Sequence, residues 1–406
     1  MIRRLTEQDV AAYLELRRRA VWAVPDELTN PSKADAKARR LAATWGYFED
    51  DNLASTATFR PLTMWLAGQV VPMAGLASVG TGPEYRRKGY VKKLLEHGLT
   101  NLHAHNQTEA VKNDPSSGIG WCLEYPFDAQ YYARYGWQSL PNGLRIQVPP
   151  EQLKPVQNVQ PQATSINLKH VASKRDVFPQ LAEIHKGFAQ GYNFALCRQD
   201  DDYINWDIVT DADDIDFGYL FAEGAYVFAY GERKNGTQTL YVEDCGYRDQ
   251  AGRLALFTFL ANLQGDVDVI DIHLTPDDPL LFDLHKFIKG KQVFFQARVV
   301  DVPVMFQNLP TAERLGHVTV KIHDKLCPWN EGVFNLVMNT EGNAATRTSK
   351  QADVSVDVRA LPLLLTGIST PEQLTHYGLA EGDVAQLAPL AGVAGGVSFM
   401  ARADYF

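Results

Sequence analysis

The sequence predicts an α+β fold made of consecutive domains. Its 406 residues exceed the ~250–300 residues that a single hydrophobic core usually supports. A strand, a turn and a helix follow one another between Met73 and Leu102. A similar order of strands and helices returns after a proline- and glutamine-rich linker that begins at Pro149, and the composition changes again near Phe295. We therefore expect three domains, at 1–148, 149–294 and 295–406.

The composition excludes several classes of protein. The chain is 45% hydrophobic and 21% charged, which is ordinary for globular proteins. It has no apolar run near the ~20 residues that span a bilayer, and its first residues lack the apolar segment of a signal peptide, so we expect a cytoplasmic protein with no membrane partner. A net charge of -9 argues against a nucleic-acid partner and is consistent with a cationic substrate.

The four cysteines point to neither a metal site nor disulfide bonds. Cys122, Cys197, Cys245 and Cys327 lie far apart and form no CxxC pair. That spacing suits neither a zinc site nor a disulfide framework. We expect buried, reduced thiols and no metal.

The first domain is expected to begin with helices and to continue with strands. Apolar residues at helical spacing predict helices at 10–19 and 35–43, whereas β-rich runs predict strands at 52–60, 69–79 and 118–124. A loop is expected at 61–68, between the first two strands. An aromatic block at 127–137 ends the domain.

A basic loop at Arg86-Arg87-Lys88-Gly89-Tyr90 separates the strand that ends near Thr81 from the following helix. Such a loop places unpaired N–H groups, a helix dipole and cations around one point, where a pyrophosphate would bind. A solvated helix start is the alternative. Gly89 is followed by Tyr90 rather than Lys, and Tyr85 stands three residues after Gly82, so neither a Walker loop nor a dinucleotide fingerprint is present.

The pattern Arg86-x-x-Gly89-x-Val91, after a strand ending in Val-x-Thr, resembles motif A of the GNAT superfamily of N-acetyltransferases. The longer run Val79-x-Thr81-x-Pro83-Glu84-Tyr85-Arg86-Arg87-Lys88-Gly89-Tyr90, with Tyr132-Ala133-Arg134-Tyr135-Gly136-Trp137, is similar to the Eis (enhanced intracellular survival) family. This resemblance implies tandem GNAT (acyl-CoA N-acyltransferase) domains followed by a sterol carrier protein-like domain. It also implies a homo-oligomer, which is hexameric in that family.

The resemblance assigns roles to individual residues. Backbone groups near Val79 and Thr81 would hold the pantetheine of acetyl-CoA, the co-substrate. The pyrophosphate would lie on the loop residues, which are Arg86, Arg87, Lys88, Gly89 and Tyr90. Tyr132 would be the general acid that protonates the CoA thiolate. Tyr135 and Trp137 are better explained as core aromatic residues.

The second domain reads as a degenerate copy of the first. Helices are expected at 177–188, 202–208 and 254–263, and strands at 217–230, 238–245 and 266–274. The segment from Tyr247 to Arg253 stands where the basic loop would be, but Asp249 adds a negative charge and the glycine register is lost. We expect no CoA there. An acidic run is either a solvated surface or a wall of the active site that attracts polycationic amines; it contains Asp200, Asp201, Asp202, Asp207, Asp211, Asp213, Asp214 and Asp216.

The third domain is similar to sterol carrier protein-like domains. Strands are expected at 297–305, 317–323, 333–339 and 354–358, and helices at 361–365 and 371–376. The chain ends in apolar residues, which predicts a packed terminus. In the Eis family the terminal α-carboxylate, here that of Phe406, reaches the active site as the base; the alternative is an ordinary buried aromatic residue. Its ordinary pKa near ~3.5 makes it a weak base, so orienting the ammonium group is a further role.

The function expected from these features is direct transfer of an acetyl group from acetyl-CoA to a small-molecule or peptide amine. Cys122 has no neighbouring histidine motif and is not expected to act as a nucleophile. The competing hypothesis is a carrier that binds a lipid or small molecule in its third domain, with the other domains as scaffolding. Trp22, Trp45 and Trp65 are either acceptor-pocket or core residues, and the acceptor amine is not identified.

Overall fold

A computed structural model describes residues 1–20, 24, 28–155, 159–166, 171–198, 217–284, 291–310 and 316–404. Three of the sequence predictions lie outside these residues. They are the acidic run at 200–216, with the helix expected at 202–208, then Trp22, and the terminal Phe406.

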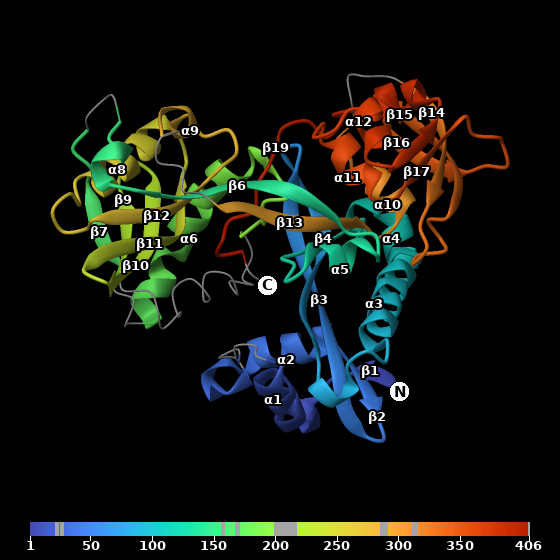
Figure 1. Ribbon diagram of the computed structural model, residues 1–406, viewed down its shortest axis with the longest axis horizontal. Helices are drawn as coiled ribbons and strands as arrows, with labels where there is room; N and C mark the ends of the chain where they lie inside the picture. Colours follow the sequence, from blue (N-terminus) through green and yellow to red (C-terminus); the bar gives the residue numbers. More distant parts are fainter. Residues whose placement is uncertain are drawn as a thin grey trace.

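One twelve-stranded sheet runs through the first two domains (Figure 1). Its order is β1-β2-β3-β4-β5-β13-β6-β12-β11-β10-β9-β7. The strands are β1 (Ile2–Arg4), β2 (Thr44–Glu49), β3 (Asn52–Leu66), β4 (Gln69–Thr81), β5 (Trp121–Glu124), β6 (Gln138–Val148), β7 (Ala163–Ile166), β9 (Phe217–Phe221), β10 (Ala225–Lys234), β11 (Thr237–Tyr247), β12 (Val269–Leu274) and β13 (Lys291–Val299).

Most of the first domain follows its sequence pattern. The helices are α1 (Val10–Arg19), α2 (Ala34–Ala43), α3 (Tyr90–Asn106), α4 (Glu109–Asn113) and α5 (Ala129–Ala133). The loop expected at 61–68 is wrong, because β3 continues to Leu66 and pairs along its length with β4. Pro61 is tolerated because β2 pairs with β3 only as far as Thr58, so at Pro61 a missing N–H breaks no bond to β2.

The first and second domains, called here the first and second halves, exchange strands. Strand β13 comes from the end of the second half, yet it lies between β5 and β6 of the first. Strand β6 in turn pairs with β12 of the second half. The boundary expected between 294 and 295 therefore falls inside β13. Helices α6 (Val171–Ala189), α8 (Gln250–Ala261) and α9 (Leu280–Asp283) complete the second half, together with the short strand β8 (Tyr192–Asn193).

In its described residues, the third domain is a five-stranded sheet with three α-helices. The strand order is β16-β15-β14-β17-β18. The elements are β14 (Gly316–His323), β15 (Gly332–Asn339), β16 (Gly342–Arg347), β17 (Val354–Asp357), β18 (Ala380–Gly382), α10 (Val302–Gln307), α11 (Ala360–Leu365) and α12 (Pro371–His376). The strand expected at 297–305 is wrong in its second half, because Asp301 caps α10 by accepting a hydrogen bond from the Val304 N–H at 3.2 Å.

Helix α11 joins the third domain to the rest of the molecule. All of its residues are buried. Its alanine and four leucines belong to a hydrophobic cluster that also contains Leu66 from β3, Trp121 from β5 and Phe295 from β13. Helix α11 therefore packs against the twelve-stranded sheet. None of the described helices is long and apolar enough to cross a membrane.

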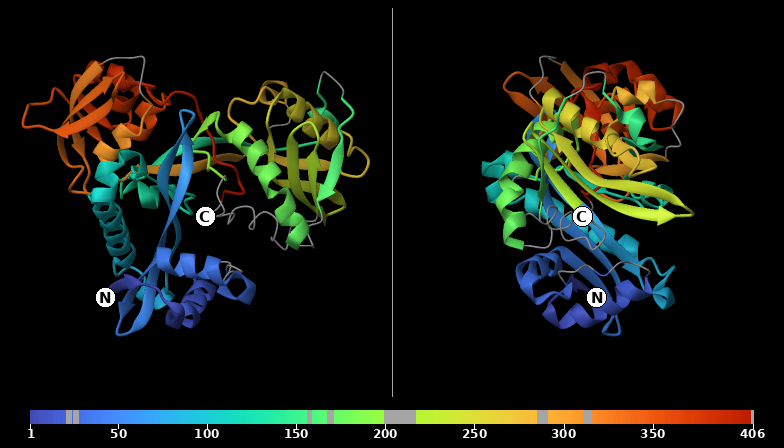
Figure 2. Two further views of the ribbon diagram at one scale, coloured as in Figure 1. Left: turned by 180° about the vertical axis from the view of Figure 1, so that it is seen from behind. Right: turned by 90° about the vertical axis from the view of Figure 1, so that its left-hand side faces the viewer.

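The C-terminal segment returns to the first two domains (Figure 2). Strand β19 (Val397–Ser398) pairs with β8 in parallel. The Asn142 side chain donates a hydrogen bond to the Met400 carbonyl at 2.9 Å, and the Tyr125 hydroxyl donates to the carbonyls of Met400 and Ala401 at 3.0 and 2.9 Å. Because Tyr125 directly follows β5, the described tail passes the end of that strand.

Candidate active site

Strands β4 and β5 separate at the centre of the first domain. They pair only where Met73–Gly75 of β4 faces Trp121–Leu123 of β5. Beyond Gly75, β4 runs on to Thr81, so its backbone groups on that side have no β5 partner. A bulge follows, because the register with β3 shifts between Thr56 and Thr58, and Ser78 has a φ of 50°. This opening exposes backbone hydrogen-bonding groups that a ligand's amides can use.

The N-terminus of α3 lies beside the end of β4. Its N-cap residue is Gly89, whose φ of 78° favours glycine, and no side chain caps the helix. A Cβ atom at Gly89 would have no neighbour within 4 Å. The first N–H groups of α3 therefore face open space with the positive end of the helix dipole, which suits an anion such as a pyrophosphate.

The corresponding helix of the second half is closed to anions. Asp249 caps α8, and its carboxylate accepts hydrogen bonds from the N–H groups of Ala251 and Gly252 at 3.0 and 3.1 Å. A Cβ atom at Gly252 would lie 2.4 Å from the carbonyl oxygen of Gly224, so there is no space for a phosphate at this turn either. A carboxylate of the chain itself thus occupies the place that a ligand phosphate would take.

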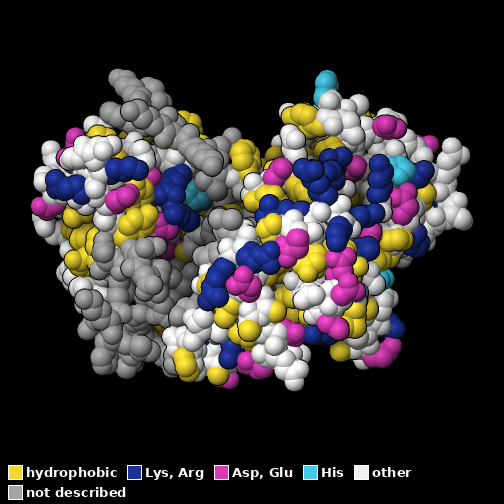
Figure 3. All heavy atoms as spheres, turned by 60° about the horizontal axis from the view of Figure 1, so that its bottom comes forward, with side chains coloured by type: hydrophobic (Ala, Val, Ile, Leu, Met, Phe, Trp, Pro, Cys, Tyr) yellow, Lys and Arg dark blue, Asp and Glu magenta, His cyan; other side chains and the backbone are white. Residues whose placement is uncertain are grey.

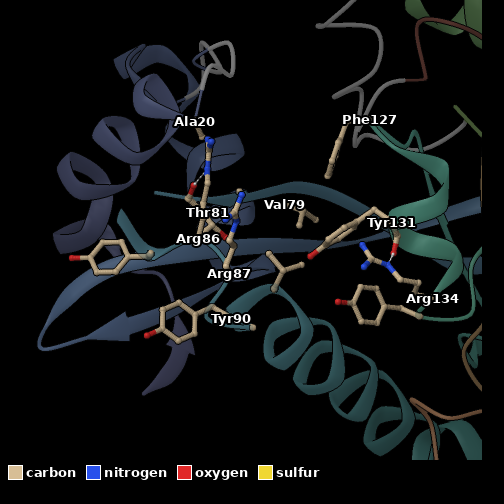
Figure 4. A pocket seen from close by; sticks show the side chains of 14 residues that line it. Ala20, Val79, Thr81, Arg86, Arg87, Tyr90, Phe127, Tyr131 and Arg134 are labelled. Carbon is tan, nitrogen blue, oxygen red and sulfur yellow. Dashed lines mark hydrogen bonds between the residues drawn. The ribbon is translucent and has the colours of Figure 1, made fainter. Parts of the chain in front are cut away.

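A cavity of about 770 Å³ joins the end of β4 to the start of α3 (Figure 4). Arg86 and Arg87 lie on one side of it, and Phe127, Tyr131 and Arg134 lie on the other, with Val79 between the two groups. The remaining lining residues are Ala20, Gly80, Thr81, Tyr85, Gly89, Tyr90, Val91 and Tyr135.

Every residue expected to bind the cofactor lines this cavity except Lys88. The ammonium group of Lys88 instead pairs with Glu49 of β2 at 2.8 Å. Tyr90 lines the cavity, but its hydroxyl also donates a hydrogen bond to Glu49, which raises the pKa of Tyr90 to about 12. Arg87 makes no ion pair with any other described residue, so its charge is available to a ligand.

Two adjacent tyrosines on α5 differ in their access to the cavity. The Tyr131 ring points into the cavity towards Val79 (Figure 4). Tyr132 does not line the cavity; it is only 3% exposed and its ring lies edge-on to that of Tyr131, with ring centres 5.1 Å apart. Burial, and then the charge of Glu124, raise the pKa of Tyr132.

The aromatic block contributes more to the cavity than the sequence predicts. Trp137 is a core residue, as expected, but Tyr135 is only half-buried and lines the cavity. The sequence motifs do not single out Phe127, Tyr131 or Arg134 as site residues. The pattern that could have identified them is the high density of aromatic residues after β5. The same density is also expected of a hydrophobic core.

The tryptophans considered for an acceptor pocket pack elsewhere. Trp45 lies between the Arg4 guanidinium, 3.8 Å from its ring centre, and the His97 ring, at 4.3 Å. Trp65 is buried against Ala189 and Ala195 of the second half. Neither lines the cavity.

The buried thiols are poor nucleophiles. Cys122 is fully buried, and burial raises its pKa well above the ordinary value. Burial likewise raises the pKa of Cys327 to about 12. Thiols that remain protonated are weak nucleophiles, so neither Cys122 nor Cys327 is a good candidate for a nucleophile.

Known protein families match the three parts of the chain. Residues 1–140 and 195–299 each match a family described as an acetyltransferase (GNAT) domain, and residues 302–398 match a sterol carrier protein domain. A Streptomyces avermitilis protein described as an uncharacterized N-acetyltransferase is 24% identical over an alignment of 347 residues that covers 79% of this chain and 78% of that protein.

Solved structures share the whole fold. A GCN5-related N-acetyltransferase from Anabaena variabilis has a TM-score of 0.81 at 20% identity, with full coverage of both chains. Eis1 from Mycobacterium abscessus has a TM-score of 0.77 at 20% identity, again with full coverage of both chains. Two acetyltransferase domains followed by a sterol carrier protein domain are thus the architecture of this chain, as its sequence predicts.

Proposed function

We propose that this chain, an Eis-like GNAT acetyltransferase by its domain order and fold, moves an acetyl group from acetyl-CoA directly to an amine. The observation that carries the proposal is the uncapped N-terminus of α3 at Gly89, next to the unpaired edge of β4. Together they offer anion-binding and amide-binding groups in one cavity, as a pyrophosphate joined to a pantetheine requires.

In this proposal the residues around the cavity have separate tasks. Arg86, Arg87 and the N–H groups after Gly89 hold the pyrophosphate, and Lys88 keeps the loop in place through Glu49. The β4 backbone near Val79 and Thr81 holds the pantetheine and polarises the thioester carbonyl. The amine attacks the thioester, and Tyr132 protonates the departing thiolate.

The tail contacts support a role for the C-terminal carboxylate of Phe406. Arg198 binds Asp404 at 2.8 Å and Asp244 at 2.6 Å, and all three side chains are buried. These bonds fix the chain two residues before its end. We propose that the terminal carboxylate accepts the amine proton or orients the ammonium group, within a cytoplasmic homo-oligomer.

A pair of matched arginines tests the cofactor site. Arg87→Ala should raise the KM for acetyl-CoA about ten- to a hundredfold, because a charge-assisted bond to phosphate is worth about 1.5–3 kcal/mol. Arg248→Ala, at the capped helix of the second half, removes an exposed arginine that pairs with Asp249 and should leave the KM unchanged. The assay is thiol release from acetyl-CoA during a screen of amines.

Two outcomes would overturn this proposal. One is the same KM for acetyl-CoA in both variants and in the unchanged protein. This result would show that the pyrophosphate does not bind at the start of α3. The other is a protein that releases no thiol with any amine while a lipid co-purifies with it, which would favour the carrier function.

A further inference from the structure

The cavity has a third arginine to which the proposed mechanism gives no task. Arg86 and Arg87 lie on one side of the cavity, where the pyrophosphate is proposed to bind. Arg134 lies on the other side, beyond Val79 (Figure 4). A cation that faces a ligand cavity from the opposite wall suits a second anionic group of that ligand.

The Arg134 side chain is held in place by the residue one helical turn before it. Its Nε atom donates a hydrogen bond to the Tyr131 carbonyl at 3.3 Å, and its guanidinium carbon lies 4.8 Å from the centre of the Tyr131 ring. Because this bond uses only the Nε–H group, the four N–H groups on the two terminal nitrogens remain. Those two nitrogens form a planar fork that matches two oxygens of one phosphate.

The charge of Arg134 is not neutralised by the described part of the chain. Arg134 is exposed and forms no ion pair with any described carboxylate. The acid nearest to it in sequence, Asp128, caps the other end of α5 by accepting hydrogen bonds from the N–H groups of Gln130 and Tyr131 at 2.9 and 3.2 Å. A cation at the end of a helix is favourable by itself, but this does not explain why the side chain is stacked on Tyr131 and lines the cavity.

The proposed donor carries a second anion of the right kind. Besides its pyrophosphate, CoA has a phosphate on the 3′-oxygen of its ribose, and a phosphate monoester of this type carries a charge of about −1.5 to −2 at neutral pH. The ribose separates the two groups, so the 3′-phosphate needs a cation away from the α3 terminus. The acceptor is a poorer match, because Arg134 would repel its ammonium form.

We propose that Arg134 binds the 3′-phosphate of CoA and thereby makes the protein select CoA over dephospho-CoA, which lacks that phosphate. This inference rests on the proposed function. The terminal nitrogens of Arg134 donate to two oxygens of the 3′-phosphate, while the Tyr131 ring and carbonyl hold the guanidinium group from its other side. Tyr131 is therefore a positioning residue, which acts through its ring rather than through its hydroxyl.

Calorimetry with CoA and dephospho-CoA tests this site without any acceptor. The unchanged protein should bind CoA about five- to tenfold more tightly, a modest factor because Arg134 is exposed. Arg134→Ala should bind CoA only as tightly as dephospho-CoA, and its affinity for dephospho-CoA should be unchanged. Arg134→Lys, which keeps the charge but loses the fork, should recover part of the difference.

Two other arginine variants serve as controls in the same experiment. Arg87→Ala should weaken the binding of both ligands by the same factor, because both contain the pyrophosphate. Arg248→Ala, at the capped helix of the second half, should change neither affinity. A preference for CoA that is the same in Arg134→Ala and in the unchanged protein overturns the proposal, as does an unchanged protein that binds both ligands equally.

Steady-state kinetics separate this inference from the proposed function. With acetyl-CoA as donor, Arg134→Ala should raise KM about five- to tenfold and keep kcat, and with acetyl-dephospho-CoA it should change neither constant. A raised KM for the amine with an unchanged KM for acetyl-CoA would place Arg134 in the acceptor site and overturn the inference. An unchanged protein that acetylates no amine, yet prefers CoA in calorimetry through Arg134, would refute the acetyl transfer and uphold the 3′-phosphate site.

Discussion

Tyr131 and Tyr132 show how far the sequence specifies single residues. The resemblance selects Tyr132, which is buried and does not line the cavity. The structure, however, turns Tyr131 into the cavity. Consecutive residues on a helix point about 100° apart, and which of them faces the ligand depends on how α5 packs, a tertiary property that local pattern does not contain.

Phenylalanine substitutions distinguish the two tyrosines. Tyr132→Phe should lower kcat about a hundredfold or more and leave the KM for acetyl-CoA unchanged, because it removes a proton donor that acts only in the transition state. Tyr131→Phe is the matched control and should change KM by a small factor with kcat retained. The reverse pattern in steady-state kinetics would assign the acid to Tyr131.

Among the structural elements, helix caps are predicted better than helix starts, because α6 begins at Val171 rather than 177 and α8 at Gln250 rather than 254. A glycine at 89 and an aspartate at 249 already distinguish an open helix terminus from a capped one, because capping is a local property. The sequence did not predict that β3 continues past Pro61 in its hairpin with β4. A strand tolerates proline where one neighbouring strand is missing, and β2 no longer pairs with β3 at Pro61.

The C-terminal segment gives a prediction at this scale. Deleting Phe406, or extending the chain beyond it by a tag, should abolish thiol release, because both remove the α-carboxylate of Phe406 that the proposed mechanism uses. Acetyl-CoA binding, measured by calorimetry, should survive, since the cofactor cavity lies on β4, α3 and α5.

Phe406→Ala is the control for that experiment, because it keeps the α-carboxylate and removes only the ring. Turnover should be retained. A variant as inactive as the deletion, together with a tolerated tag, would show that the ring matters and the carboxylate does not.

In the whole molecule, the strand exchange is the feature that the sequence does not predict. The repeat of strands and helices, and the change of composition near Phe295, give the number and the kinds of domain. They do not show that β13 lies between β5 and β6, because strand partners far apart in sequence are chosen by tertiary packing.

Shared strands predict shared stability between the first two domains. Leu256 of α8 is fully buried in the core of the second half. Leu256→Ala should cost about 2–5 kcal/mol of unfolding free energy. Hydrogen exchange should speed up in α3 as well as in α8, because β6 and β13 join the first and second halves in one continuous sheet. Faster exchange confined to the second half would show independent domains.

The place of β13 also sets the order in which the protein can be completed during synthesis. The ribosome makes β5 by residue 124, but the strand that covers its free edge is finished only at residue 299. At about 5–20 residues per second, the edge of β5 waits roughly 10–35 seconds for its partner. An uncovered strand edge invites pairing with other chains, so the nascent protein should depend on chaperones during this interval. Strand β13, which borders β5 beside the proposed acetyltransferase site, is added only once the second half has been made.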